Sequence, residues 1–194
     1  FHACVGVTGE LIESQGAGQS VEVVAKEITI YGGTDLSEYP LQAKSQTMEF
    51  LRENAPFRMR TNTFIAALRP RHALAFATNK YYNDRHFYYL HTPIISGNDA
   101  VGPGEMFRLP ALDPASPPKD EDSNVDYSQD FFGKSTHLTV SGQLQAEIGA
   151  LAMGKVYTFG PTFRAENSHT TRHLSEFWMI EPEIAFADID NNQD

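Results

Sequence analysis

Two runs of apolar and β-branched residues near the start of the chain predict a pair of strands. They cover residues 5–12 and 20–31, with Gln-Gly-Ala-Gly at residues 15–18 as the turn between them. Because two or three strands are not stable on their own in water, we expect this pair to belong to a larger β-domain. The polar residues that follow predict a linker with one short helix over residues 41–51, ended by Pro56.

From residue 61 the spacing changes to a helical one. Apolar residues recur three, four or six positions apart up to Tyr81, which predicts a long helix. Pro70 lies inside this segment and should kink the helix or force a break nearby. The aromatic residues 86–90 then predict a strand.

The second half of the chain predicts a hairpin of two long strands. Residues 156–166 and 176–186 form the strands, and the polar residues 167–175 join them. Before the hairpin we expect a short strand at residues 138–140 and a helix over residues 143–153, for which Ser141 can act as a cap. The pattern indicates a mixed α and β fold rather than a βαβ series.

Composition narrows the class of protein without naming a function. The 194 residues are 41% hydrophobic and carry a formal charge of −10, which excludes a disordered, collagen-like or disulfide-stapled chain. One cysteine, Cys4, cannot form an internal disulfide, so a reducing compartment such as the cytoplasm is expected. No apolar run reaches the ~20 residues of a membrane span, so no membrane association is expected.

The acidic average hides an uneven distribution of charge. Residues 113–130 and 176–194 hold 12 of the 25 acids, counted as six in each range. Five of the 15 basic residues fall within 20 positions, namely Arg52, Arg58, Arg60, Arg69 and Arg71. This basic segment could contact a nucleic acid, and contact between two copies of the chain is an equally open interpretation.

The hairpin carries the residues with the clearest chemistry. Alternation puts Arg164 and Glu166 on one face, and Phe177 can project onto the same face from the other strand. The loop adds Arg172 and His173. Guanidinium groups bind phosphate and an aromatic ring stacks on a base, so this set suits a nucleoside triphosphate. The alternative is an exposed hairpin with an Arg–Glu pair worth ~0.5 kcal/mol.

The same segment resembles motif 2 of the class II aminoacyl-tRNA synthetases. Phe-Arg-Ala-Glu at 163–166 and Arg-His-Leu-Ser-Glu-Phe at 172–177 carry the likeness to the aspartyl, asparaginyl and lysyl subgroup. The predicted long helix and the strand that follows it, through residues 91–95, resemble motif 1. Further stretches resemble the bacterial-type asparaginyl enzymes, namely residues 97–100, 104–108, 130–134, 138–144 and 178–186.

The resemblance implies a fold, a domain order and an activity. The fold is α+β: the first half of an antiparallel class II sheet with flanking helices, preceded by the last strands of an OB-fold barrel. The domains would be the end of an anticodon-binding OB-fold at 1–33, a linker at 34–60 and the first half of the catalytic domain at 61–194. The activity would be ATP-dependent ligation of asparagine to tRNA(Asn) through asparaginyl-adenylate, by a homodimer formed through motif 1.

The resemblance also assigns roles to individual residues. Arg164 would be catalytic, binding the α-phosphate of ATP and stabilising charge on the phosphoryl oxygens. Phe177 would stack on adenine. The remaining ATP-binding residues would be Glu166, Arg172 and His173, and Asn167, Ser168 and His169 would touch the acceptor end of the tRNA.

The amino-acid pocket would comprise Ser141, Gln143, Glu147 and Glu183. In aspartyl relatives a lysine that meets the substrate carboxylate occupies the position of Ala146, and its absence here favours asparagine, whose amide could donate to Glu147. An aspartyl enzyme, a non-catalytic synthetase-derived binding module, and Glu147 as an ordinary exposed helix residue are the alternatives.

Three residues depart from the family pattern, and one of them, Pro70, falls where the motif 1 helix is usually uninterrupted. Val101 replaces a glutamate suited to the substrate ammonium, with Glu105 as the nearest substitute, and His169 replaces an asparagine. His169 and His173 have a metal-ligand spacing but no third ligand, so no metal site is predicted. Motif 3 and the ligands of Mg²⁺ would lie beyond residue 194. We therefore expect a chain with missing pieces that cannot form the adenylate alone.

Overall fold

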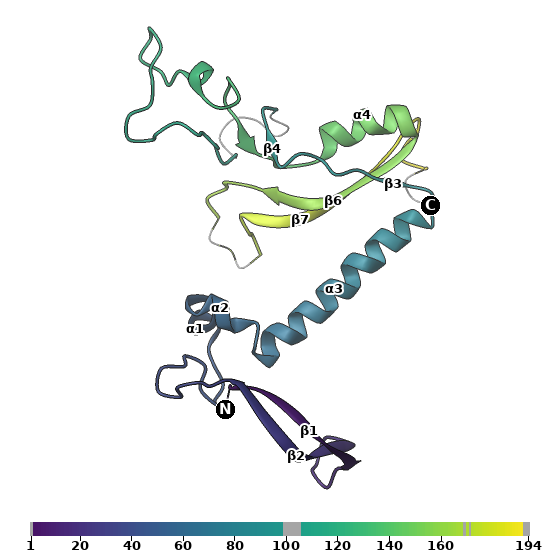
Figure 1. The fold of residues 1–194 in the computed structure, drawn as a ribbon. Helices are drawn as coiled ribbons and strands as arrows, with labels where there is room; N and C mark the ends of the chain where they lie inside the picture. The colour runs from purple at the N-terminus through teal and green to yellow at the C-terminus, as the bar shows by residue number, and fades with distance from the viewer. Residues whose placement is uncertain (1, 99–105, 169, 171, 192–194) are drawn as a thin grey trace. The chain divides into compact units, whose positions relative to one another are not determined.

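The computed structural model describes residues 2–98, 106–168, 170 and 172–191. The chain forms two compact units, Phe1–His72 and Ala73–Asp194, and the boundary falls within a long helix, α3 (Figure 1). The predicted domain borders at residues 33 and 60 stay a prediction. The stretch that contains Val101 and Glu105 lies outside the described residues.

The first unit begins with the predicted strand pair. Strands β1 (Cys4–Glu13) and β2 (Val21–Gly32) are antiparallel, and the turn between them is closed by a hydrogen bond from the Ser14 N–H to the Ser20 carbonyl at 3.1 Å. The register shifts after Thr8, where Gly9 lies so close to β2 that a Cβ atom would stand 2.2 Å from the Val24 carbonyl oxygen. Most apolar side chains of the pair are exposed, Ile30 by 69%.

The linker helix starts later than the sequence pattern predicts. Helix α1 (Met48–Glu53) begins after Thr47, whose Oγ1 accepts a hydrogen bond from the Phe50 N–H at 3.2 Å. The predicted start at residue 41 is therefore wrong. Pro56 lies in the first turn of α2 (Ala55–Arg58), where a missing N–H costs little. Among residues 2–72, which the structure describes, Leu41 and Leu51 are the buried ones, 5% and 1% exposed.

Helix α3 (Asn62–Asn83) runs without interruption through Pro70 (Figure 1). The predicted break is therefore wrong, and the alternative, a kink, stays a prediction. A proline in a helix interior removes one backbone hydrogen bond and costs ~3 kcal/mol. A helix of 22 residues has full turns on both sides of the proline to offset that cost.

The second unit is built on the predicted hairpin. Strands β6 (Lys155–Phe163) and β7 (Glu176–Ile184) are antiparallel, and β3 (Tyr88–Tyr89) pairs with the other edge of β6 in parallel. Helix α4 (Gln143–Met153), with the predicted bounds, lies along the hairpin (Figure 1). Ala146, Ala150 and Val156 form the buried core here, with Leu90 packed against them.

A smaller sheet completes this unit. Strands β4 (Ile95–Ser96) and β5 (His137–Leu138) are antiparallel, and the acidic residues between them form turns and one short 3₁₀ helix at Tyr127–Gln129. The antiparallel sheets and flanking helices confirm the predicted α+β class. In the described part of the chain, no helix combines the length and apolar character that crossing a membrane requires.

Candidate active site

The end of the β6–β7 hairpin brings Arg164, Glu166 and Phe177 together. Strand alternation predicts this, although β6 ends at Phe163 rather than at the predicted residue 166. The Arg164 N–H donates to the Ser175 carbonyl at 3.0 Å, which continues the strand pairing beyond β6. An Arg164 guanidinium nitrogen lies 3.7 Å from Glu166 Oε1, and the guanidinium carbon lies 5.7 Å from the centre of the Phe177 ring. An ion pair this long leaves guanidinium donors available to a ligand.

A cleft of about 360 Å³ opens around these three residues. Arg172 and His173 line it from the loop, together with Ser168, Leu174 and Ser175. The Nε atom of Arg164 is buried and has no hydrogen-bond partner among the described residues. With two guanidinium groups against one carboxylate, the cleft favours an anionic ligand, and the Phe177 ring offers a flat surface for a base.

Loop hydroxyl groups hold the His173 ring. Its Nδ1 atom contacts the hydroxyl of Thr170 and lies 3.2 Å from that of Ser168. The Ser168 N–H donates to the Glu166 carbonyl at 2.9 Å, which ties this part of the loop to the strand end. Asn167 is exposed beside it, and His169 lies outside the described residues.

The predicted amino-acid pocket residues gather around the start of α4. Gln143 Nε2 donates to Glu147 Oε1 at 2.9 Å, one helical turn along. Burial raises the pKa of Glu183 on β7, and the negative charges of Glu147 and Glu181 raise it further. Glu147 and Glu181 therefore both lie within electrostatic range of Glu183.

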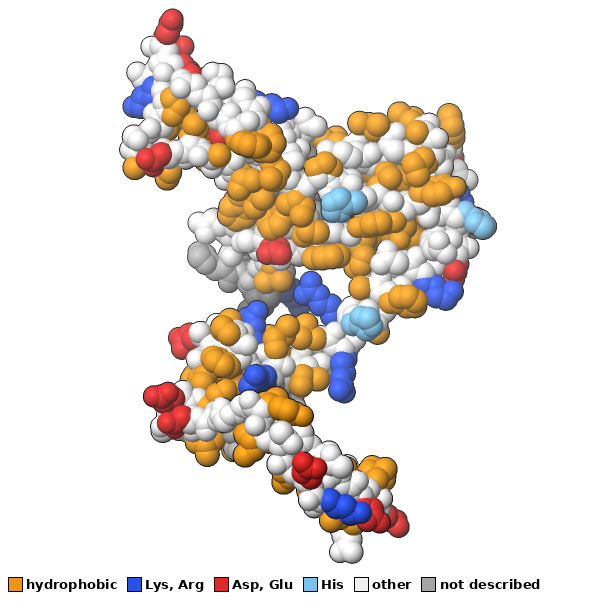
Figure 2. Space-filling view, in the orientation of Figure 1, with side chains coloured by type: hydrophobic (Ala, Val, Ile, Leu, Met, Phe, Trp, Pro, Cys, Tyr) orange, Lys and Arg blue, Asp and Glu red, His pale blue; other side chains and the backbone are white. Residues whose placement is uncertain are grey.

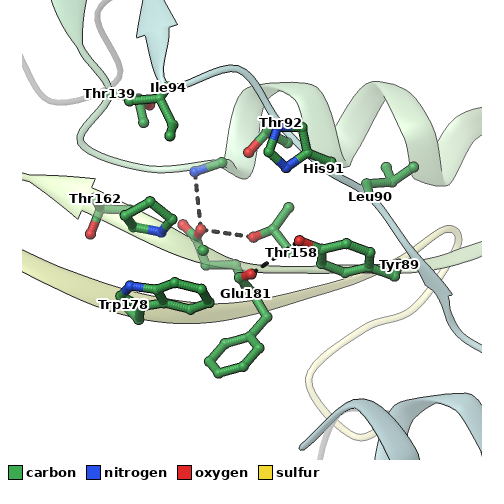
Figure 3. Close-up of a pocket in the computed structure, with 14 residues that line it drawn as sticks. Tyr89, Leu90, His91, Thr92, Ile94, Thr139, Thr158, Thr162, Trp178 and Glu181 are labelled. Atoms are coloured by element: carbon green, nitrogen blue, oxygen red, sulfur yellow. Dashed lines mark hydrogen bonds between the residues drawn. The ribbon is translucent and has the colours of Figure 1, made fainter. Parts of the chain in front are cut away.

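Glu181 is the residue that the sequence analysis missed. Its carboxylate accepts hydrogen bonds from the Ser141 hydroxyl, the Gly142 N–H at 3.0 Å and the Thr158 hydroxyl at 2.9 Å. Figure 3 shows it beside a small pocket of about 100 Å³, to which Thr158 on β6 and the segment through His91 also contribute. Strand alternation could have indicated Glu181, because residues 177, 181 and 183 lie on the same face of a strand.

The same bonds explain how α4 begins. Gly142 is the cap residue by backbone position, and its side chain can make no bond. The Ser141 hydroxyl accepts from the Gln143 N–H at 3.0 Å while donating to Glu181. Ser141 therefore supplies the capping bond that the sequence predicts, from one position earlier.

Ala146 faces the carboxylates' side of the sheet. It is fully buried against Val156, which lies opposite Glu183 in the strand register. An ammonium group at position 146 would therefore enter the neighbourhood of Glu183. The charged side chains that act on Glu183 are Glu147 and Glu181, and both are acidic.

Comparison with known proteins places the chain in a family. Residues 47–193 match the family model described as tRNA synthetases class II (D, K and N). The chain belongs to this family. The finding confirms the resemblance carried by motifs 1 and 2.

The similar curated proteins are asparagine–tRNA ligases. The chain is 60% identical to that of Azobacteroides pseudotrichonymphae and 56% identical to that of Cytophaga hutchinsonii, each over 192 residues. That of Clostridium novyi is 55% identical over 190 residues. These alignments cover 98–99% of the chain and 41% of each relative, so the chain spans about two fifths of their length.

Solved structures show the same fold. A crystal structure of asparaginyl-tRNA synthetase from Pyrococcus horikoshii, complexed with asparaginyl-adenylate, matches with a TM-score of 0.78 at 24% identity, covering 98% of this chain and 39% of that one. The asparaginyl-tRNA synthetase of Entamoeba histolytica, also with asparaginyl-adenylate, matches with a TM-score of 0.75 at 22% identity, covering 98% and 40%.

Proposed function

We propose that the protein containing this chain ligates asparagine to tRNA(Asn), forming asparaginyl-adenylate from ATP as the intermediate. The observation that carries the proposal is the cleft in which Arg164, Glu166 and Phe177 converge at the end of the β6–β7 hairpin. The curated relatives named asparagine–tRNA ligase support the choice of amino acid.

The cleft suits ATP at both of its ends. Phe177 would stack on adenine, while Arg164 would bind the α-phosphate and stabilise the charge that builds on its oxygens. Glu166 would orient Arg164, and Arg172 and His173 would meet the terminal phosphates. The carboxylate of the amino acid attacks the α-phosphorus and pyrophosphate leaves, so positioning and electrostatics suffice and no protein nucleophile is needed.

Mg²⁺ is the metal expected with ATP, and the described residues do not supply its site. Among them, no group of three or more His, Cys, Asp or Glu is arranged to hold a metal ion. We expect its ligands, together with motif 3, in the part of the relatives' length that this chain does not cover.

The carboxylates beside α4 favour asparagine over aspartate. The side-chain amide of asparagine can donate to Glu147, whereas a substrate carboxylate would be repelled by Glu147, Glu181 and Glu183. Burial is the main cause of the raised pKa of Glu183, and the negative charges of Glu147 and Glu181 raise it further. Ser141 and Gln143 would line the same pocket, held in place by Glu181 and Glu147.

The remaining parts of the proposal concern partners and place. Asn167, Ser168 and His169 would touch the acceptor end of tRNA(Asn), and residues 1–33 would belong to the anticodon-binding domain. Dimerisation through motif 1 is supported by exposed apolar side chains on α3, such as Leu74 and Phe76, 66% and 69% exposed. An enzyme of protein synthesis with these substrates would work in the cytoplasm.

The test is asparagine-dependent exchange of pyrophosphate into ATP, measured on the whole protein. We expect exchange with asparagine but not with aspartate, and its loss in Arg164→Ala. The exposed Arg85→Ala, which removes one charge from the end of the α3 segment, serves as the matched control. Exchange that depends on aspartate would support an aspartyl enzyme instead, and the absence of exchange with either amino acid would support a binding module.

A further inference from the structure

The first unit has a groove of its own, separate from the hairpin cleft. It occupies about 430 Å³ between the segment before α1 and the start of α3. Its ionisable lining residues are His2, Lys44 and Arg60, and no acid is among the described residues that line it. Ser45, Asn62 and Thr63 add uncharged polar groups. The lining is thus rich in hydrogen-bond donors and has no carboxylate to compete for them.

The walls of this groove are fixed by packing. Leu41 and Leu51, both buried, form its base. The Tyr39 ring stacks on His2 with 4.2 Å between centroids, and the Arg60 guanidinium donates to the Tyr39 hydroxyl at 2.9 Å. Preorganised donors lose less conformational entropy when a ligand binds, so the arrangement favours recognition.

The positive charges around the groove are not neutralised within the unit. Among the described residues, Lys44 and Arg60 form no ion pair, and the same holds for Arg52 on α1 and Arg58 on α2. Arg58 lies over the Phe64 ring at 5.0 Å instead. Figure 2 shows basic side chains on the surface around α1, α2 and the start of α3. The net charge of −10 describes the whole chain, and it does not reveal this local group of cations that form no ion pair.

We propose that this groove binds the sugar–phosphate backbone of RNA. A phosphodiester keeps its negative charge at all physiological pH values, so it matches a lining that offers a guanidinium fork, an ammonium group and no acid. The hydroxyl and amide groups of Ser45, Asn62 and Thr63 suit ribose 2′-hydroxyls, and the volume exceeds the needs of one phosphate group. The proposal rests on the proposed function, since the RNA it names is the tRNA substrate.

The experiment uses the whole protein and removes two charges from the groove. Lys44→Gln removes a side chain without a partner, and Arg60→Gln keeps an NH₂ donor for the Tyr39 hydroxyl. In the double variant we expect the dissociation constant for tRNA to rise on the order of tenfold at ~0.1 M salt. The slope of log K against log salt should fall by about 2, one for each lost phosphate contact.

Matched variants separate this effect from a general change in charge or fold. Lys119→Gln with Lys155→Gln removes the same charge from exposed positions outside the groove and should leave both quantities unchanged. Arg60→Lys keeps the charge and should keep the salt slope. Lys44→Gln alone should lower the slope by about 1 without affecting stability, because the only bond of Lys44 among the described residues is made by its backbone N–H, which the substitution keeps.

Measuring tRNA binding and pyrophosphate exchange separately distinguishes a failure of this proposal from a failure of the proposed function. Asparagine-dependent pyrophosphate exchange should be unchanged in the double variant, because exchange needs no tRNA. If the wild type shows no exchange but the salt slope for RNA still falls in the variants, the groove proposal stands and the proposed function fails. Unchanged tRNA affinity and salt slope in the double variant would overturn the groove proposal. This holds even if the double variant altered dimerisation or the binding of inorganic phosphate.

Discussion

The Ser141 hydroxyl donates a hydrogen bond to the Glu181 carboxylate, joining the start of α4 to the middle of β7 across 40 positions of sequence. The Gly142 N–H and the Thr158 hydroxyl donate to the same carboxylate. One acidic side chain thus fixes the helix that carries Gln143 and Glu147 against β7, the strand that carries Glu183 and Phe177. Glu181 is a positioning residue for both proposed substrate sites.

Replacing Glu181 should disturb the fold and the amino-acid pocket together. Glu181→Ala leaves three donors without an acceptor and should lower the free energy of unfolding by about 2–4 kcal/mol. Glu181→Gln retains one acceptor oxygen and should cost about 1 kcal/mol while raising KM for asparagine more than KM for ATP. Thermal unfolding and pyrophosphate exchange measure the two effects. Glu176→Gln, at an exposed position of the same strand, is the control.

The raised pKa of Glu183 gives a pH dependence with a definite sign. Its folded-state pKa lies above the ordinary value of 4.5, chiefly through burial and then through Glu147 and Glu181, so the folded state holds this proton more tightly than the unfolded state. The favourable contribution is present at low pH and is lost as the pH rises from about 4.5 through the folded-state pKa. Glu183→Gln removes that dependence.

The measurement for Glu183 is the difference in Tm between variant and wild type at several pH values from 4 to 8. Carboxyl groups with lowered pKa values, such as Asp126, which accepts bonds from Ser128 and Gln129, act with the opposite sign but cancel in this difference. We expect Glu183→Gln to gain in relative stability as the pH rises. A difference that does not vary with pH would contradict the assignment. Glu147→Gln should weaken the same dependence.

Gly9 tests the close approach of the two N-terminal strands. A Cβ atom there would stand 2.2 Å from the Val24 carbonyl oxygen, so Gly9→Ala must push the backbones apart. We expect a loss of about 1–3 kcal/mol, seen as faster amide hydrogen exchange in β1 and β2 of the whole protein. Gly33→Ala meets no atom within 4 Å and should leave exchange unchanged. Equal effects of the two substitutions would show that the strand pair tolerates a side chain at position 9.

Local sequence patterns predicted those helices and strands that are determined by residues within the element itself. The hairpin of β6 and β7 and the bounds of α4 follow from alternation and helical spacing, and the structure confirms them. The short helix at residues 41–51 was misplaced because Leu41 packs in the core without being helical, and the Thr47 cap, a one-residue signal, decides the start. A break near Pro70 was predicted from the cost of a proline inside a helix. The helix continues because α3 is long enough to offset that cost.

The same distinction between local and long-range determinants applies to the candidate sites. Arg164, Glu166 and Phe177 lie within one hairpin, so their convergence could be predicted from the strand period. The bonds of Glu181 connect three elements far apart in sequence, and no local pattern specifies that Ser141 and Thr158 meet the same carboxylate. The basic groove similarly joins residues 41–46 to residues 60–63. Sequence showed its excess of arginine but not that acids are absent from its lining.

The Phe177 ring provides the sharpest test of the ATP site, because stacking depends on an aromatic plane rather than on hydrophobicity alone. Phe177→Leu keeps a large apolar side chain on the strand but removes the plane, and should raise KM for ATP about tenfold in pyrophosphate exchange, corresponding to ~1–3 kcal/mol of lost stacking. Phe177→Tyr keeps the plane and should stay within about twofold of wild type. Trp178→Leu, on the opposite face of β7, is the matched control and should alter stability without altering KM for ATP. Equal KM values for Phe177→Leu and wild type would place adenine elsewhere.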